Sequence, residues 1–340
     1  MSHISLFIAL RDVLVVAREG GPAGWTAREH LQGKRPQCLA ADPLSPGRIY
    51  CGTARDGLWI TDDGGDSWRP PPDGAGMPES RVTAVAVAPA EARDGRSIVY
   101  VGTEPSAVYR SDTGGERWTA LKGLKSLPSA PTWSFPPRPE THHVRWLEPD
   151  PHQAGRLFAC IEAGALVHTD DAGRTWHDRV LGGPYDTHTL ATHPAAPGRL
   201  YAAAGDGYFE SDDGGKSWRQ SERGLRHHYL FSVAVDPEDA GTVLVSAAPH
   251  PFRAYDPKRA ESAVYRKSGG GEWEEVDGGL PDGTGTTVSV LFASTRGVFW
   301  AANNRGVYRS TDGGTRWERL AIPWPDAYTS GNVLAFVAAD

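Results

Sequence analysis

Hydrophobic residues of this chain gather in runs of about six, and each run ends near glycine, proline or aspartate. One set of runs reads IYCGT (49–53), IVYVGT (98–103), LFACIE (157–162) and LYAAAG (200–205). A further run lies upstream in each case, as in VTAVAVAP (82–89) and FSVAVDP (231–237). Short runs rich in β-forming residues and bounded by turn residues are typical of strands, whereas helical periodicity is nowhere sustained. The pattern predicts an all-β protein.

A polar phrase with the pattern Ser/Thr-x-Asp-x-Gly-x-x-Trp follows these runs. It reads TDDGGDSW (61–68), SDTGGERW (111–118), TDDAGRTW (169–176), SDDGGKSW (211–218) and STDGGTRW (310–317), with a degenerate copy, RKSGGGEW, at 266–273. Thr113 and Ser268 replace the aspartate in two copies. Successive tryptophans are separated by 50, 58, 42, 55 and 44 residues. That spacing is the length of a propeller blade of four short strands.

The repeat divides the chain into blades, in which the phrase joins the third strand to the fourth. Blades 1 to 6 are expected at 35–72, 81–121, 143–181, 186–222, 229–277 and 285–321. The N-terminal residues 4–31 lack an inner strand, and residues 332–340 form an inner strand with nothing after it. Joining the two ends gives blade 7 and removes the open edges of the array. We therefore predict a single domain, 1–340, folded as a seven-bladed β-propeller of four-stranded antiparallel blades.

The repeated phrase resembles the Asp-box, or BNR, repeat of sialidases, sortilin-type receptors, xyloglucanases and photosystem II assembly factors, over essentially the whole chain. The resemblance implies the fold but not the function, because the same scaffold carries hydrolases, receptors and assembly factors. The Arg-Ile-Pro phrase of sialidases is missing, since the nearest text is Arg48-Ile49-Tyr50, and their arginine triad cannot be matched. Xyloglucanase-type enzymes pair two propellers, whereas this chain predicts one.

The aspartates of the phrase are Asp63, Asp171, Asp213 and Asp312. Each carboxylate can accept backbone N–H groups in its turn, while the glycines take positive φ and the tryptophan packs between blades. A catalytic role is disfavoured because four copies around a ring cannot all act on one substrate. A calcium-binding role is disfavoured because a loop of the EF-hand type needs alternating ligands and a closing glutamate. We therefore interpret these aspartates as structural.

Propeller connectivity predicts which face is free for function. The turns between first and second strands lie on one face with the boxes, and the remaining connections lie on the other, here called the top face. Two long segments, 122–143 and 247–260, both fall on the top face. Long loops in compact domains are commonly functional, and the aromatic and proline content of these two argues against simple disorder.

Polar residues concentrate at the same face, mainly in blades 3 to 5. The candidate catalytic residues are His143, Arg145, His188, His228 and Tyr229. The candidate ligand-binding residues are Arg55, Glu104, Trp133, Glu162, Asp206, His250, Arg253, Asn304 and Arg305, with Trp133 expected to stack on a sugar ring.

Three interpretations of this channel mouth stay open. A divalent metal could be held by His143, His188, His228 and Glu162, since imidazole and carboxylate are common metal ligands. Histidine and tyrosine could act as base and acid on a sugar or uronate whose carboxylate is clamped by arginine, as in propeller-fold polysaccharide lyases. The third interpretation is a solvated polar mouth without a ligand.

The composition of the chain limits the classes of partner that we expect it to bind. With 35 basic and 42 acidic side chains the formal charge is −7, which argues against a nucleic-acid-binding surface. Arg11 and Asp12 interrupt the N-terminal apolar run, so neither a membrane span nor a signal peptide is expected. We predict a soluble, cytoplasmic binding or assembly propeller whose top face takes a small molecule, glycan or protein partner. The alternative is a glycoside hydrolase or polysaccharide lyase.

Overall fold

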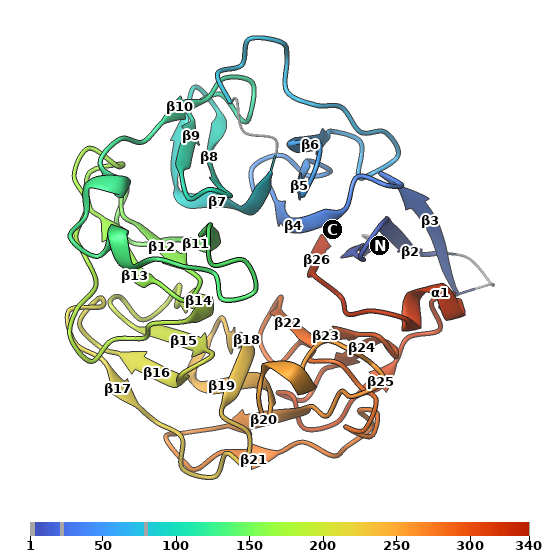
Figure 1. The fold of residues 1–340 in the computed structure, drawn as a ribbon. Helices are drawn as coiled ribbons and strands as arrows, with labels where there is room; N and C mark the ends of the chain where they lie inside the picture. Colours follow the sequence, from blue (N-terminus) through green and yellow to red (C-terminus); the bar gives the residue numbers. More distant parts are fainter. Residues whose placement is uncertain (1–3, 21–23, 78–80, 340) are drawn as a thin grey trace.

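The computed structural model describes residues 4–20, 24–77 and 81–339, and these form seven antiparallel sheets arranged in a ring (Figure 1). Blade 1 contains β4 (Pro36–Ala41), β5 (Ile49–Thr53) and β6 (Leu58–Thr61), and blade 2 contains β7 (Val82–Arg93), β8 (Arg96–Thr103), β9 (Val108–Ser111) and β10 (Thr119–Ala120). Blade 3 contains β11 (Val144–Pro149), β12 (Leu157–Ile161) and β13 (Ala165–Thr169), and blade 4 contains β14 (Thr187–Thr192), β15 (Leu200–Ala204), β16 (Gly207–Ser211) and β17 (Arg219–Gln220).

The remaining blades complete the ring. Blade 5 contains β18 (Tyr229–Asp236), β19 (Asp239–Ala248), β20 (Ala263–Lys267) and β21 (Glu274–Glu275), and blade 6 contains β22 (Val290–Ala293), β23 (Phe299–Asn303), β24 (Gly306–Ser310) and β25 (Glu318–Arg319). Blade 7 joins β26 (Ala335–Ala339) to β1 (Ser5–Ala9), β2 (Leu14–Glu19) and β3 (Trp25–His30). The seven-bladed propeller predicted from the repeat is confirmed.

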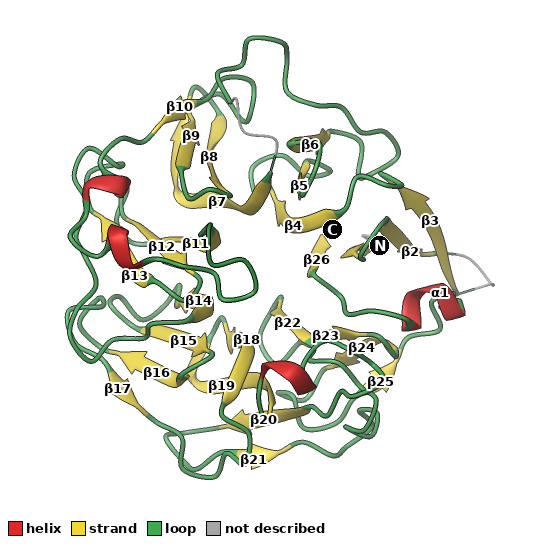
Figure 2. Ribbon diagram, in the orientation of Figure 1, coloured by secondary structure: helices red, strands yellow, loops and turns green. Residues whose placement is uncertain are grey.

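Helix is confined to short turns in the connections (Figure 2). These are η1 (Leu124–Ser126), η2 (Ala130–Thr132), η3 (Pro251–Arg253) and α1 (Asp326–Thr329). Within the described ranges, none of the helices has the length and apolar character needed to cross a membrane.

Two blades depart from the predicted four strands. In blade 1 the fourth strand is reduced to a bridge between Ile60 and Arg69, and in blade 3 to a bridge between His168 and His177. In blade 1 the cause is the run of three prolines at 70–72, which offers no N–H groups for a ladder. In blade 3 the carboxylate of Asp178 instead accepts hydrogen bonds from the 122–143 connection, at Ser129 N (2.7 Å) and Ser129 Oγ (2.5 Å).

The two ends of the chain close blade 7 as the sequence predicts. Strand β26 pairs antiparallel with β1, from Ser5 opposite Ala339 to Ala9 opposite Ala335. Both ends of the chain lie in this one blade (Figure 1). The inner strand of the blade is therefore supplied by the C-terminal segment, which pairs with the edge of β1.

The boxes lie on the face of the turns between first and second strands. In four blades a box amide donates to the carbonyl of such a turn: Gly64 to Gly47 (2.8 Å), Ala172 to Gly155 (2.8 Å), Gly214 to Gly198 (2.9 Å) and Gly313 to Gly297 (2.9 Å). The boxes also join neighbouring blades, since all six box tryptophans pack in hydrophobic clusters between adjacent sheets. A side chain at Gly65 would place its Cβ 2.8 Å from the Phe7 ring of blade 7. These boxes therefore hold blades together.

Asp213 shows what the box aspartates do. Its carboxylate accepts hydrogen bonds from Ser217 N (2.9 Å), Ser217 Oγ (2.6 Å) and Ser211 Oγ (2.9 Å). The hydrogen bonds from Ser217 lower the pKa of Asp213 to about 2. The carboxylates of Asp63, Asp171 and Asp312 likewise each accept a hydrogen bond from the backbone N–H four residues further along the chain. These contacts are those that the structural interpretation of the aspartates expects, and the interpretation itself stays a prediction.

We expect Asp213→Ala to lower the free energy of unfolding by about 1–2 kcal/mol, because the loss of the carboxylate leaves the Ser217 amide without its acceptor. Asp213→Thr is the matched control, since Thr113 already fills this position in blade 2 and its Oγ1 accepts from Arg117 N at 2.9 Å. The folded pKa lies below the unfolded one, so this contribution is present above about pH 4 and is lost as the pH falls toward 2. Urea unfolding of both variants, repeated at acidic pH, measures these effects. Equal losses for alanine and threonine would contradict the prediction.

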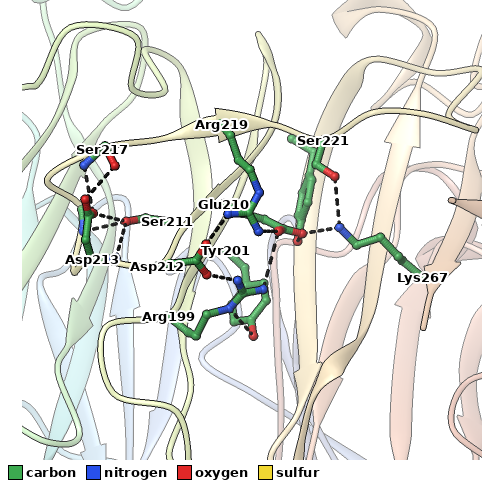
Figure 3. A network of polar contacts seen from close by, with 12 residues as sticks. Arg199, Tyr201, Glu210, Ser211, Asp212, Asp213, Ser217, Arg219, Ser221 and Lys267 are labelled. Carbon is green, nitrogen blue, oxygen red and sulfur yellow. Dashed lines mark hydrogen bonds and ion pairs between the residues drawn. The ribbon is translucent and has the colours of Figure 1, made fainter. Parts of the chain in front are cut away.

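The degenerate box of blade 5 lies beside a different stabilising interaction, a buried ion pair. Strand β20 ends at Lys267, whereas the third strands of the other boxed blades end at the serine or threonine of the box, and the Lys267 side chain is 6% exposed. Its ammonium pairs with Glu210 and lies 4.7 Å from the centre of the Tyr208 ring and 4.9 Å from that of Trp273. Figure 3 shows Glu210 between Lys267 of blade 5 and Arg219 of blade 4. A buried ion pair replaces the box at this blade interface.

Candidate functional site

A cavity of about 280 Å³ lies at the centre of the ring, lined by residues of all seven inner strands. Its walls are mainly apolar, and its two charged side chains, Arg145 and Glu148, both come from β11. Burial raises the pKa of Glu148 to about 7, although the hydrogen bonds that its carboxylate accepts from Thr192 act to lower that pKa. Blade 3 thus gives one side of the channel a polar wall.

A second cavity, of about 420 Å³, lies at the channel mouth on the top face. Arg11 from the β1–β2 turn, Arg35 before β4 and Tyr255 from the 247–260 connection line it. It shares Gln37 and Leu334 with the central cavity, so the two cavities adjoin each other at these residues.

Opposite these arginines lies a cluster of ionisable side chains from blades 3, 4 and 5. Inner strands begin at the top face, so the residues that start β11, β14 and β18 meet around the mouth. His143 Nε2 lies 2.8 Å from Glu162 Oε2, and Arg145 Nε lies 3.5 Å from the same oxygen. Burial would raise the pKa of Glu162, but the hydrogen bond from His143 and the nearby positive charge hold it at about 2. Glu162 is therefore an ionised, largely buried carboxylate.

His188 joins this carboxylate to blade 5. Its Nε2 lies 4.0 Å from Glu162 Oε1, 3.7 Å from Asp186 Oδ2 and 3.4 Å from the Tyr229 hydroxyl. The Tyr229 hydroxyl in turn lies 2.6 Å from that of Tyr255, which lines the mouth cavity. Burial raises the pKa of both tyrosines, so they are neutral hydrogen-bonding groups. The chain of contacts runs unbroken from His143 to the mouth.

The cluster thus contains four of the five predicted catalytic residues. His143, Arg145, His188 and Tyr229 meet around Glu162, whereas His228 does not. Adjacent residues of an extended chain point to opposite sides, so Tyr229 faces inward and His228 outward. The His228 side chain is 58% exposed and its Nδ1 lies 3.4 Å from Glu222 Oε2. The expectation that the three histidines converge is wrong for His228.

Trp133 is placed differently from the prediction. Its side chain is 5% exposed and packs on Gly164, and its indole donates to Ser129 Oγ at 3.0 Å. An indole enclosed in the core of blades 2 and 3 offers no face to a sugar ring. The exposed aromatic residues of the top-face connections are instead Tyr185 and Phe252.

Other predicted ligand-binding residues support the loops around the mouth. Glu104 pairs with Arg81 and with Arg138 of the 122–143 connection. That connection reaches in toward the centre of the ring (Figure 1), where the Phe135 ring packs edge-on against His143. Asp206 accepts the amides of Tyr185 and Asp186, at 3.0 Å each. Asp206 therefore fixes the segment that carries Asp186.

The remaining predicted residues are spread around the rim. Asn304 is buried and holds the backbone at Thr287 and Gly285. His250 accepts the Phe252 amide, and Arg253 pairs with Glu261. Arg55 and Arg305 are exposed. None of these five contacts the Glu162 cluster in the described contacts.

Asp186 and Arg35 are the residues that the sequence interpretation missed. Both lie just before an inner strand on the top face, as His143 does, and that shared position is the signal that could have identified them. Within the described residues, two groups have donor atoms close enough to share a metal ion. These are Glu162 with Asp186 and His188, and the mostly buried His168 with the exposed Asp170 and His177.

No protein-family model and no curated protein matches this chain. An ancestral GH74 enzyme is similar in structure, with a TM-score of 0.62 and 16% identity over 90% of this chain and 38% of that one. YCF48 bound to a D1 peptide gives 0.59 and 17%, over 84% of this chain and 81% of that one. YCF48 from Cyanidioschyzon merolae gives 0.58 and 15%, over 84% and 85%.

At such identities the likeness shows the fold alone, a β-propeller. The chain spans less than half the length of that GH74 enzyme but most of the length of the YCF48 structures. Membership of the Asp-box repeat family stays a prediction.

Proposed function

We propose that the chain is a binding or assembly propeller that takes a polar ligand, a glycan or a peptide segment, at the channel mouth on its top face. The observation that carries the proposal is the ionisable cluster around Glu162. Buried charge weakens a fold unless it is fully compensated, and an inner strand of a propeller can be built without it. Its assembly from three blades beside an open cavity favours a role in recognition.

The chemistry of the mouth supports a ligand that carries both hydrogen-bond donors and acceptors. Arg11 and Arg35 lie on one side, and Glu162 and Asp186 lie on the other. The exposed Tyr185, beside Arg179, offers an aromatic face at the rim. One structural neighbour, YCF48, binds a D1 peptide, and another is a GH74 enzyme.

We expect Arg145→Ala to weaken ligand binding at least tenfold, since a hydrogen bond from a charged donor contributes about 1.5–3 kcal/mol. The guanidinium lies against the Phe231 ring at 5.3 Å, and Glu162 keeps its bond to His143 without it, so the fold is retained. A panel of acidic and neutral oligosaccharides and of peptides is titrated by calorimetry. The matched control is Arg93→Ala, an exposed arginine that ends β7 next to the turn to β8 on the box face. The proposal fails if nothing in the panel binds, or if both variants bind as the parent does.

A carbohydrate hydrolase or lyase is the second candidate. Glu162 and Asp186 have carboxylate oxygens within 4.8 Å of each other, beside the tyrosine–histidine pair of Tyr229 and His188. Paired carboxylates at roughly this separation are the groups that glycoside hydrolysis uses. Incubation of the same oligosaccharides with the protein, followed by assay of reducing ends and of unsaturated uronate, distinguishes the two functions. Turnover that Glu162→Gln abolishes would favour the enzyme.

A further inference from the structure

Three side chains at the channel mouth each have one polar atom held by the protein and a second polar atom that faces the others. They are Glu162, Asp186 and His188. Glu162 Oε2 accepts from His143 Nε2 at 2.8 Å, and Asp186 Oδ1 accepts from Ala163 N at 2.8 Å. The second oxygens, Glu162 Oε1 and Asp186 Oδ2, both face the imidazole of His188. The two carboxylates are thus anchored with a free oxygen each.

The tautomer of His188 is fixed by its backbone contact. Nδ1 lies 2.5 Å from the carbonyl oxygen of Leu230, which can only accept, so Nδ1 carries a hydrogen. In the neutral imidazole Nε2 then carries a lone pair, which faces the Tyr229 hydroxyl at 3.4 Å, Asp186 Oδ2 at 3.7 Å and Glu162 Oε1 at 4.0 Å. The His188 side chain is 1% exposed, so water does not screen this arrangement. Two carboxylate oxygens and a lone pair facing one another repel unless a proton on Nε2 or a metal cation lies between them.

Gly205 makes room for one of these oxygens. A Cβ at this position would lie 2.1 Å from Asp186 Oδ2. Its φ is not in the positive range, so space rather than backbone conformation requires the glycine. Asp206 holds the backbone of Asp186 from the next position in the chain. The β15–β16 turn is therefore shaped around the Asp186 carboxylate.

We propose that Glu162 Oε1, Asp186 Oδ2 and His188 Nε2 bind a divalent transition-metal ion, with zinc as the reference case. Zinc bonds to nitrogen and oxygen are about 2.0–2.2 Å long, so tetrahedral ligands lie about 3.3–3.5 Å apart. The two separations from His188 Nε2, 4.0 Å and 3.7 Å, exceed this by about half an ångström, and the ligand atoms of all three residues lie within 4.8 Å of one another. An imidazole donor selects against magnesium and calcium, which prefer oxygen alone.

The surrounding contacts match those of metal ligands elsewhere. A metal-bound histidine commonly donates its other N–H to a carbonyl, as His188 does to Leu230, and a ligand carboxylate is commonly hydrogen-bonded, as Glu162 is to His143. Three protein ligands leave a coordination position for water or for a ligand donor at the mouth. The assignment replaces His228 and His143 of the predicted metal set by Asp186, and keeps His188 and Glu162.

The test is zinc binding by the full chain after removal of metals with a chelator. Calorimetry and metal analysis are expected to give one tightly bound equivalent at the mouth, and cobalt(II) in its place is expected to show the absorption of a four-coordinate site. Glu162→Gln and Asp186→Asn keep the size of each side chain and are expected to weaken this binding at least a hundredfold. Gly205→Ala displaces Asp186 Oδ2 and is expected to weaken it without removing a ligand.

His177→Ala is the matched control, since it disrupts the exposed group on the outer edge of blade 3 and leaves the mouth intact. Thermal unfolding of each metal-free variant shows whether it is folded. The proposal is overturned if the folded Glu162→Gln and Asp186→Asn variants bind zinc as the parent does, if His177→Ala alone removes the tight equivalent, or if the parent binds none. A parent that binds none would leave His188 as an imidazolium between the two carboxylates. No glycan or peptide is present, so the result is independent of the proposed function.

Discussion

A chain that ends at residue 333 is expected to lose its cooperative fold, because blade 7 then has no inner strand. Strand β26 supplies five residue pairs to β1 and buries Phe336 and Val337. The Phe336 ring packs against Phe292 and Trp300 of blade 6, with ring centres 6.2 Å apart in each case. The loss therefore opens the ring at two blade interfaces, and it approaches the 5–15 kcal/mol that typically separates folded from unfolded domains.

The single variant Phe336→Ala keeps the strand and isolates the packing. We expect it to lower the free energy of unfolding by about 3–5 kcal/mol, as for other buried aromatic residues. Its matched control is Phe252→Ala, which removes an equal ring that is 73% exposed and is expected to change stability by less than about 0.5 kcal/mol. Urea unfolding and size-exclusion chromatography measure both variants and the shortened chain. A shortened chain with the parent's midpoint would show that closure by β26 is dispensable.

The repeat made the fold predictable because the box specifies several things at once. Its glycines, its aspartate and its tryptophan each have a local role in the turn, and the spacing of successive tryptophans gives the blade length. The closure of the ring was predictable because residues 4–31 lack an inner strand and residues 332–340 form one. The prediction failed where a non-repeated residue intervened, as with the prolines after Trp68 and the contact of Asp178 with the 122–143 connection.

The site was less predictable because its members come from separate blades. The sequence identifies residues at the starts of inner strands, and His143, His188 and Tyr229 were found in that way. It does not identify which side of a strand a residue faces when the strand is just beginning, so His228 was grouped with Tyr229. Asp186 was missed because its importance lies in its position opposite Glu162, which belongs to another blade.

Glu210→Gln is expected to destabilise the interface of blades 4 and 5 more than Lys267→Met, although both break the same ion pair. In Glu210→Gln the buried ammonium of Lys267 loses its carboxylate, and among the described contacts it keeps only neutral oxygen partners, Ser221 Oγ at 3.3 Å and the new amide oxygen. Without Lys267 the carboxylate of Glu210 keeps Arg219 at 2.5 Å and Arg199 at 3.5 Å, and the methionine chain fills the space beside Trp273. Leaving one buried charge unpaired costs about 3–5 kcal/mol. We therefore expect about 3 kcal/mol or more for Glu210→Gln and less than half of that for Lys267→Met.

The pH dependence separates an unpaired charge from a simple loss of packing. Burial lowers the pKa of Lys267 even beside Glu210, and the loss of Glu210 lowers it further. The unfolded chain, with an ordinary lysine pKa of about 10.4, then binds more protons than the folded one, so stability rises with pH in this window. The deficit of Glu210→Gln should shrink from neutral pH toward pH 10 in urea unfolding. The control is Glu272→Gln, which breaks the exposed pair with Arg223 and should cost less than about 0.5 kcal/mol at either pH. A deficit of Glu210→Gln that stays constant with pH would show that Lys267 is not held charged in the parent protein.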